Sequence, residues 1–281
     1  MFVAGALLFG VFSVLWIQKV YTGPSRVFWG MIENNLSTSG VTRRTVNEQG
    51  GQKTDQYTQL SFVDPVASHS YVDLVQGDGN NGTQVRTETI GTKDTDYSRY
   101  ISIKTNQKSQ DGKPLDFSKV QQVWGKSDQL GGGQYYRQAA LGLVLFANLD
   151  NATALEVSNK LRQQDVYTVD YSKAKSTKVN GKSVWTYAVK LDVAKYLTVV
   201  KEYSKKLPLG NIDELDPEQY KSSPPIELSI SVGKLSRQVV QIQTSDGQKE
   251  DYLSYGLKAP VELPEKTIPI SDLQQRLQQA R

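Results

Sequence analysis

Between Val41 and Lys104 the sequence alternates apolar and polar residues with a period of two, and this feature constrains the fold more than any other. Five segments there are rich in Thr, Tyr, Val and Ile and are bounded by Gly, Asn or Asp, as strands are. They are Val41–Val46, Gln56–Val63, His69–Gln76, Gln84–Ile90 and Tyr97–Lys104. The connections between them are of hairpin length. Because parallel strands need a crossover of a dozen or more residues, the sequence predicts an antiparallel sheet.

Six further strands are expected in the second half of the chain. Asn180-Gly181 is a strong hairpin signal, and in the strand that follows it Trp185 and Tyr187 share one face. The six segments are Val166–Tyr171, Lys175–Val179, Val184–Leu191, Ile226–Val232, Leu235–Gln243 and Lys249–Gly256. About eleven strands are therefore predicted, with helices inserted between them and at both ends.

Apolar residues at helical spacing predict the helices. Asp192 is placed as an N-cap, and Ser271 with Gln274 has the spacing of a capping box. The expected helices are Arg26–Leu36, Phe117–Trp124, Gln134–Leu149, Asn151–Gln164, Asp192–Lys206 and one that begins at Ser271. No linker is long enough to separate domains, so residues 25–281 are expected to form a single α+β domain.

The N-terminal segment Met1–Ile17 carries no charge and is about long enough to cross a membrane. It lacks the basic start and the cleavage site of a signal peptide, so we expect residues 1–21 to be an uncleaved transmembrane anchor. A cleaved signal and a buried core helix are the alternatives. Lys19 lies on the C-terminal flank of the segment, and the positive-inside rule alone would keep the residues after it in the cytoplasm. Large domains, however, translocate largely regardless of charge. Because nothing basic precedes the run, we also expect that an upstream segment is missing.

Composition and motifs argue against catalysis and against nucleic-acid binding. The chain has no Cys, which excludes disulfides, thiol nucleophiles and Cys-ligated metals, and its net charge is only +4, with the charges interspersed. His69 is the only histidine and has no second histidine to share a metal. Gly77–Gly82 matches a dinucleotide fingerprint, but a strand pattern follows it where a helix is required. We therefore expect no catalytic residue, no metal, no cofactor and no nucleic-acid partner.

The apolar stretch "QAALGLVLFANL" (Gln138–Leu149) is hydrophobic nearly all round, so its helix is expected to be covered on every side. It is either a core helix or a helix that lines an apolar cavity, the usual setting of a ligand pocket. On the second interpretation Leu141, Leu145, Phe146 and Leu149 bind the ligand, facing the sheet residues Trp185 and Tyr187.

The order of elements resembles that of the LolA/LppX-like lipoprotein-carrier family, which includes RseB-like members. The likeness is carried by "TETIGTKDTDYSRYISI" (Thr87–Ile103), "VNGKSVWTYAVKLDVAKYLTVVKEY" (Val179–Tyr203) and "IELSISVGKLSRQVVQIQTSDGQKEDYLSYG" (Ile226–Gly256). The resemblance implies a curved antiparallel half-barrel with helices on its concave side and an apolar cavity between them. It also implies binding or sensing of lipids or lipid anchors. The chain has no lipobox cysteine, so a helix would tether it.

Two functions follow as expectations. The first is a single-pass membrane protein of a bacterial cell envelope whose extracytoplasmic domain binds a lipid or another hydrophobic ligand without catalysis. The second is a structural or sensory domain that contacts another envelope protein and binds no ligand. The apolar insert favours the first function, and the helical tether favours the second.

Overall fold

The structure is a computed structural model that describes residues 21–77, 82–127, 133–210, 212–257 and 261–280. The expected anchor at residues 1–21 lies outside them, apart from Tyr21. None of the helices in the described ranges combines the length and the apolar character needed to span a membrane.

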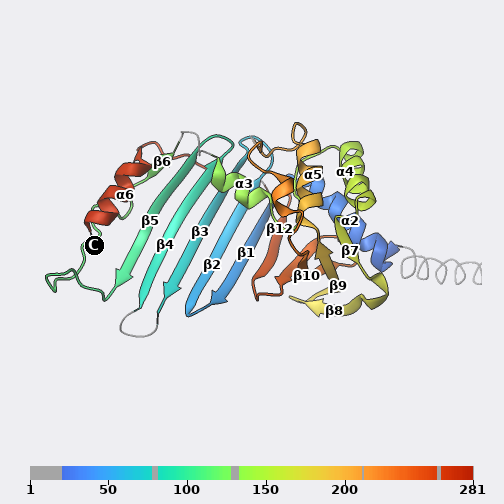
Figure 1. Cartoon of the computed structure of the whole chain (residues 1–281), viewed down its shortest axis with the longest axis horizontal. Coiled ribbons are helices and arrows are strands. Elements are labelled where there is room, and N and C mark those ends of the chain that lie inside the picture. The colour runs from blue at the N-terminus through green and yellow to red at the C-terminus, as the bar shows by residue number, and fades with distance from the viewer. Residues whose placement is uncertain (1–20, 78–81, 128–132, 211, 258–260, 281) are drawn as a thin grey trace, which may run out of the picture.

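In this part of the chain, thirteen strands form one curved sheet (Figure 1). Its order is β13-β6-β5-β4-β3-β2-β1-β12-β11-β10-β9-β7, with β8 paired to β9. The strands of the first half are β1 (Gly40–Gln49), β2 (Gln52–Ser61), β3 (Ala67–Gln76), β4 (Thr83–Thr92), β5 (Asp96–Thr105) and β6 (Gly125–Ser127). Those of the second half are β7 (Tyr167–Val169), β8 (Lys175–Val179), β9 (Lys182–Leu191), β10 (Ile226–Gly233), β11 (Val239–Thr244), β12 (Lys249–Tyr255) and β13 (Ile268–Pro269).

All eleven expected strands are present, and the short strands β6 and β13 add to them. The two halves of the chain become one sheet because β1 pairs with β12, where Val41 lies opposite Tyr255. Every pair is antiparallel, as expected, except that between β13 and β6, which is parallel. Pairing between strands so far apart in sequence was not predicted, because the alternation within a strand does not identify its partner.

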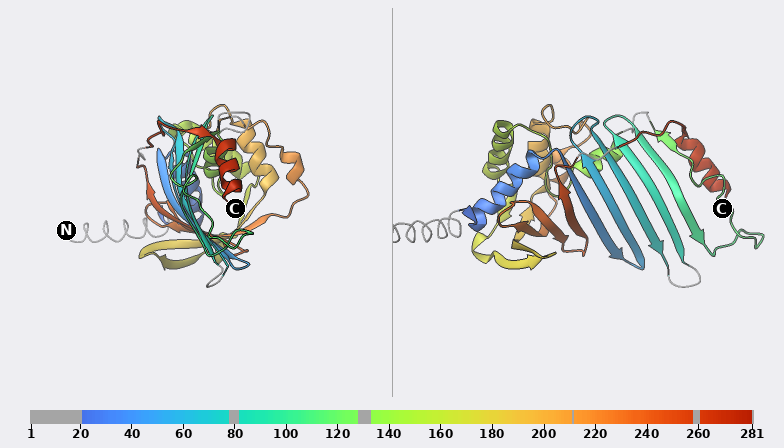
Figure 2. Two further views of the ribbon diagram at one scale, coloured as in Figure 1. Left: turned by 90° about the vertical axis from the view of Figure 1, so that its left-hand side faces the viewer. Right: turned by 180° about the vertical axis from the view of Figure 1, so that it is seen from behind.

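Five α-helices accompany the sheet in the described residues. They are α2 (Pro24–Leu36), α3 (Gln134–Ala140), α4 (Asn151–Gln163), α5 (Val193–Glu202) and α6 (Ile270–Gln279). The left view of Figure 2 shows α5 and α6 on one side of the sheet. Asp192 caps α5 as predicted, since its carboxylate accepts a hydrogen bond from the backbone N–H of Lys195 at 3.0 Å.

One predicted helix is absent, and the predicted cap of the last helix is wrong although that helix is present. Residues 117–124 form turns instead of a helix, and they lead directly into β6. Helix α6 begins at Ile270 with Pro269 as its N-cap residue, and no side chain caps it, so Ser271 does not form the predicted capping box.

The predicted helix Gln134–Leu149 was also wrong beyond Ala140. From residue 141 to 149 the chain is irregular and lies along the C-terminal end of α2. The backbone N–H of Ala147 donates to the carbonyl of Asn35 at 3.1 Å, and that of Leu149 donates to the carbonyl of Leu36 at 2.9 Å. The last four carbonyls of a helix have no partner inside it, and the segment satisfies two of those of α2. A continued helix would have used the same N–H groups internally.

Helix α2 lies in the core, and the predicted apolar face is the buried one. Val27, Phe28, Met31, Ile32 and Leu36 are all at most 1% exposed. The ring of Phe28 meets that of Tyr187 on β9 edge-on, with 5.4 Å between ring centroids. The sheet surface on which the ligand cavity was expected is therefore already occupied by α2.

Candidate ligand-binding cavity

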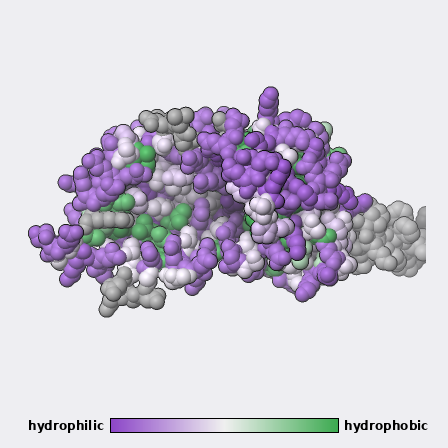
Figure 3. Space-filling model, in the orientation of Figure 1, coloured by the Kyte–Doolittle hydropathy of each residue, from purple (hydrophilic) through white to green (hydrophobic). Residues whose placement is uncertain are grey.

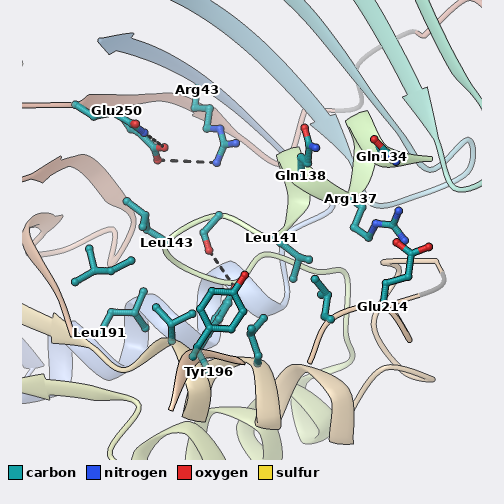
Figure 4. A pocket seen from close by; sticks show the side chains of 17 residues that line it. Arg43, Gln134, Arg137, Gln138, Leu141, Leu143, Leu191, Tyr196, Glu214 and Glu250 are labelled. Atoms are coloured by element: carbon teal, nitrogen blue, oxygen red, sulfur yellow. Dashed lines mark hydrogen bonds and ion pairs between the residues drawn. The ribbon is translucent and has the colours of Figure 1, made fainter. Parts of the chain in front are cut away.

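A cavity of about 650 Å³ lies between α3, α5 and the sheet (Figure 4). Strands β1 and β12 contribute Arg43 and Glu250, and α5 contributes Tyr196. Much of its wall is apolar, made by Leu141, Leu143, Leu191, Val193, Leu197, Leu215 and Ile226. The wall also carries polar and charged side chains, those of Arg43, Gln134, Arg137, Gln138, Glu214, Gln248 and Glu250. Apolar surface beside polar groups suits a ligand that has both an apolar and a polar part.

Helix α3 is held on the sheet by two features of the neighbouring strands. The carboxylate of Asp96 on β5 accepts hydrogen bonds from the backbone N–H groups of Gln134 (2.9 Å) and Tyr135 (3.1 Å), so it caps the N-terminus of the helix. Gly91 on β4 leaves room for the helix, since a Cβ there would lie 2.3 Å from the backbone nitrogen of Tyr136. This placement brings Gln134, Arg137 and Gln138 to the cavity.

The floor of the cavity is fixed by two tyrosines. Tyr196 on α5 donates a hydrogen bond to the carbonyl oxygen of Gly142 at 3.1 Å, and Tyr167 on β7 donates to that of Leu143 at 3.2 Å. Burial raises the pKa of both phenols well above the usual value, so both remain neutral donors. The irregular segment after α3 therefore has a defined position although it has no regular secondary structure.

A buried charged pair forms one end of the cavity. Arg43 Nη1 lies 3.9 Å from Glu250 Oε2, with the two side chains 10% and 6% exposed. Glu250 also accepts hydrogen bonds from the Tyr252 hydroxyl at 2.8 Å and from the Gln248 amide at 3.2 Å. Burial acts to lower the pKa of Arg43, but the Glu250 carboxylate and Tyr252 together raise it, so the guanidinium is charged.

The six residues predicted to bind the ligand are not brought together. Leu141 lines this cavity, and the other five do not. Leu145 and Phe146 are each 1% exposed in the core, where the Phe146 ring stacks on that of Tyr252 with centroids 5.6 Å apart, and Leu149 packs against the same core. Trp185 and Tyr187 donate hydrogen bonds to the carbonyl oxygens of Thr22 and Pro24, both at 2.8 Å. Ligand contact by these five residues stays a prediction.

The sequence prediction missed Arg43, Glu250 and Tyr196. In "VTRRTV" the alternation places Arg43 on the same face of its strand as Val41, and Arg44 on the other. An arginine in an apolar register position was the signal that pointed to a buried charge. Glu250 carried no comparable signal, because only the pairing of β12 with β1 brings it near Arg43.

A second hollow of about 750 Å³ lies over the other half of the sheet. Figure 3 shows apolar side chains gathered on this part of the surface. They belong to residues on β3, β4 and β5, to the segment after β5 and to α6: Val72, Leu74, Val85, Ile103, Leu115, Phe117 and Leu277. The sheet therefore offers apolar surface at two places.

His69 lies on the sheet face opposite to this hollow, and it has a partner there in Glu88. Its Nε2 lies 2.7 Å from Glu88 Oε1, and Arg99 Nε donates to Glu88 Oε2 at 2.6 Å. The described ranges contain no group of three or more His, Cys, Asp or Glu residues that could hold a metal ion. The Gly77–Gly82 stretch lies partly outside the described residues.

No protein-family model matches the chain, and no curated protein matches it. Among solved structures the chain is similar to the crystal structure of LprF from Mycobacterium bovis, with 14% identity and a TM-score of 0.40. The alignment covers 86% of this chain and 98% of LprF.

Proposed function

We propose that the protein is a non-enzymatic binding domain for a lipid or another amphiphile, and that the apolar part of the ligand occupies the cavity between α3, α5 and the sheet. The observation that carries this proposal is the cavity of about 650 Å³, whose wall combines a cluster of leucine, valine and isoleucine side chains with polar and charged ones. Each methylene group transferred from water into such a site contributes about 0.8 kcal/mol. A single acyl chain therefore supplies enough free energy for specific binding.

Native mass spectrometry of the domain purified from cells tests this function, because a bound lipid adds its own mass. Leu141→Trp is expected to reduce lipid binding, since Leu141 lines the cavity, while the thermal unfolding temperature stays close to that of the unaltered protein. Leu155→Trp is the matched control, because Leu155 lies on α4 and is 49% exposed. Absence of co-purified lipid together with no binding of fluorescent fatty acids would contradict the proposal.

We further propose that residues 1–21 tether the domain to the cell membrane, with residues from about 25 onward on the extracytoplasmic side. The support is the uncharged run Met1–Ile17 and the lack of a signal-cleavage site. Fractionation is expected to find the full chain in membranes, and protease added to intact cells is expected to digest the domain. Release of a soluble form that lacks the run would show that the segment is a cleaved signal.

The alternative function, a domain that contacts another envelope protein, is favoured by exposed apolar surface on both faces of the sheet. The hollow over β3–β5 is apolar, and on the other face of the sheet Tyr57 and Tyr71 are 37% and 39% exposed. Exposed apolar surface of this kind is typical of interaction sites. Leu74→Asp is expected to disrupt a protein contact at this hollow without affecting lipid binding in the cavity beside Arg43.

A further inference from the structure

We infer that the cavity selects amphiphiles with an anionic headgroup, a carboxylate or a phosphate, and that Arg43 is the counter-charge. This inference rests on the proposed function, because it assigns the headgroup of the ligand whose apolar part the cavity holds.

In the described part of the chain, two of the three guanidinium nitrogens of Arg43 are buried without a hydrogen-bond partner, and Tyr252 and Glu250 compensate the charge only in part. The Arg43 side chain is only 10% exposed, and among the residues that the structure describes neither Nε nor Nη1 has a hydrogen-bond partner. Buried charged groups in proteins are normally paired and hydrogen-bonded, because the loss of hydration is costly. An anion that enters the cavity beside Arg43 would supply the missing compensation.

Glu250 does not fill this role. Its nearest oxygen lies 3.9 Å from Arg43 Nη1, beyond hydrogen-bond distance. Both Glu250 oxygens already accept hydrogen bonds, one from Tyr252 and the other from Gln248. The carboxylate is thus satisfied mainly by neutral donors, while the guanidinium is not.

The cavity wall is shaped around the guanidinium. A Cβ on Gly142 would lie 2.8 Å from Arg43 Nη1, so any other residue at position 142 would press on the charged group. The carbonyl of Gly142 is itself held by the Tyr196 hydroxyl. Figure 4 shows the guanidinium directed into the cavity above Leu141 and Leu143. The charge therefore meets the apolar wall where an acyl chain would end in its headgroup.

The remaining charged groups of the cavity lie at its other end. Figure 4 shows the side chains of Arg137 and Glu214 pointing toward one another, away from Arg43. With Arg43 and Glu250, they are the charged residues of the cavity wall. Selectivity for an anion is assigned to the Arg43 end because Arg43 keeps N–H groups without an acceptor among the described residues there, whereas both oxygens of the neighbouring Glu250 already accept hydrogen bonds.

A pair of probes that differ only in charge tests the inference. The probes are 11-(dansylamino)undecanoic acid and its methyl ester, which carry the same chain and fluorophore. The acid is expected to bind about tenfold more tightly than the ester, or better, because a hydrogen bond to a charged group is lost in the ester. Palmitate and a monoalkyl phosphate are then used as competitors, and the stronger competitor identifies the headgroup.

Arg43→Met is expected to abolish the preference for the acid, because methionine keeps an unbranched apolar chain without the charge. Arg44→Met is the matched control, since Arg44 is the adjacent residue on the opposite face, paired with Asp55, and it is expected to leave the preference unchanged. If Arg43→Met fails to fold because Glu250 is left unpaired, the double variant Arg43→Met/Glu250→Gln is used in its place, since it removes both charges.

The outcomes separate the inference from the proposed function. If the unaltered protein binds acid and ester equally, or if the preference survives in the Arg43 variants, the inference is overturned and lipid binding stands. If neither probe nor competitor binds, the proposed function itself fails. Loss of the preference in the Arg43 variants, with ester binding retained, supports both.

Discussion

The hydroxyl of Tyr187 on β9 donates a hydrogen bond of 2.8 Å to the carbonyl oxygen of Pro24, the first residue of α2. Burial raises the pKa of this phenol far above its usual value, so the group stays a neutral donor. Two residues earlier in the same strand, Trp185 donates to the carbonyl of Thr22. Strand β9 thus fixes the backbone of Thr22 and Pro24 at the start of α2.

Tyr187→Phe is expected to lower the free energy of unfolding by about 1 kcal/mol, because it removes this hydrogen bond and keeps the ring packed against Phe28. Denaturation with urea measures the difference. Tyr220→Phe is the control, since Tyr220 is 40% exposed. An equal effect of the two substitutions would show that the bond to Pro24 contributes nothing to stability.

Leu145→Trp is expected to destabilise the protein by about 1–3 kcal/mol, because the side chain is 1% exposed and the added ring has no free space. The measurement is a urea denaturation curve, compared with that of Leu141→Trp at the cavity wall. If Leu145→Trp blocked lipid binding and left stability unchanged, Leu145 would line a ligand space after all.

Gly91→Ala is expected to destabilise the domain and to weaken ligand binding, because the new Cβ would lie 2.3 Å from the backbone nitrogen of Tyr136 and would push α3 away from the sheet. At an open position the same change stabilises a protein by about 0.4–1 kcal/mol, so the sign of the effect is the test. Thermal unfolding and probe titration give the two readings. Thr89→Ala on the same strand is the control.

Glu88→Gln is expected to reduce the acid sensitivity of the protein. Burial acts to raise the pKa of Glu88, but the hydrogen bonds from His69 and Arg99 outweigh it, and the pKa is lowered from its usual value of 4.5. A carboxylate with a lowered pKa stabilises the folded state above the unfolded pKa, and this contribution is lost as the pH falls through the folded pKa.

The unaltered protein is therefore expected to lose more stability than Glu88→Gln between about pH 6 and pH 3. At pH 7 the variant is expected to be less stable by about 3 kcal/mol, since it breaks a buried ionic contact with Arg99. Asp73→Asn, in the more exposed pair with Arg86, is the control and is expected to change stability little. If the free energy of unfolding of Glu88→Gln and that of Asp73→Asn changed with pH in the same way, the role of Glu88 would be refuted.

The strands were predictable because the information for each is local. A strand with one buried face must alternate, and that alternation placed β1 to β5 and β7 to β12 close to their observed positions. The buried face of α2 followed from the 3.6-residue period for the same reason. Of the two interpretations of the apolar stretch, the one that placed Leu145 and Phe146 in the core matches their burial.

The cavity depends on relationships that no local pattern contains. Composition marked Gln138–Leu149 as apolar, but the carbonyls at the end of α2, a hundred residues earlier in the sequence, determine that this segment leaves the helix after Ala140. Likewise Arg43 and Glu250 become neighbours only because β1 pairs with β12. Periodicity reports which side of an element avoids water. Packing and hydrogen bonding between distant segments decide which element covers that side, and where a gap or an uncompensated charge is left.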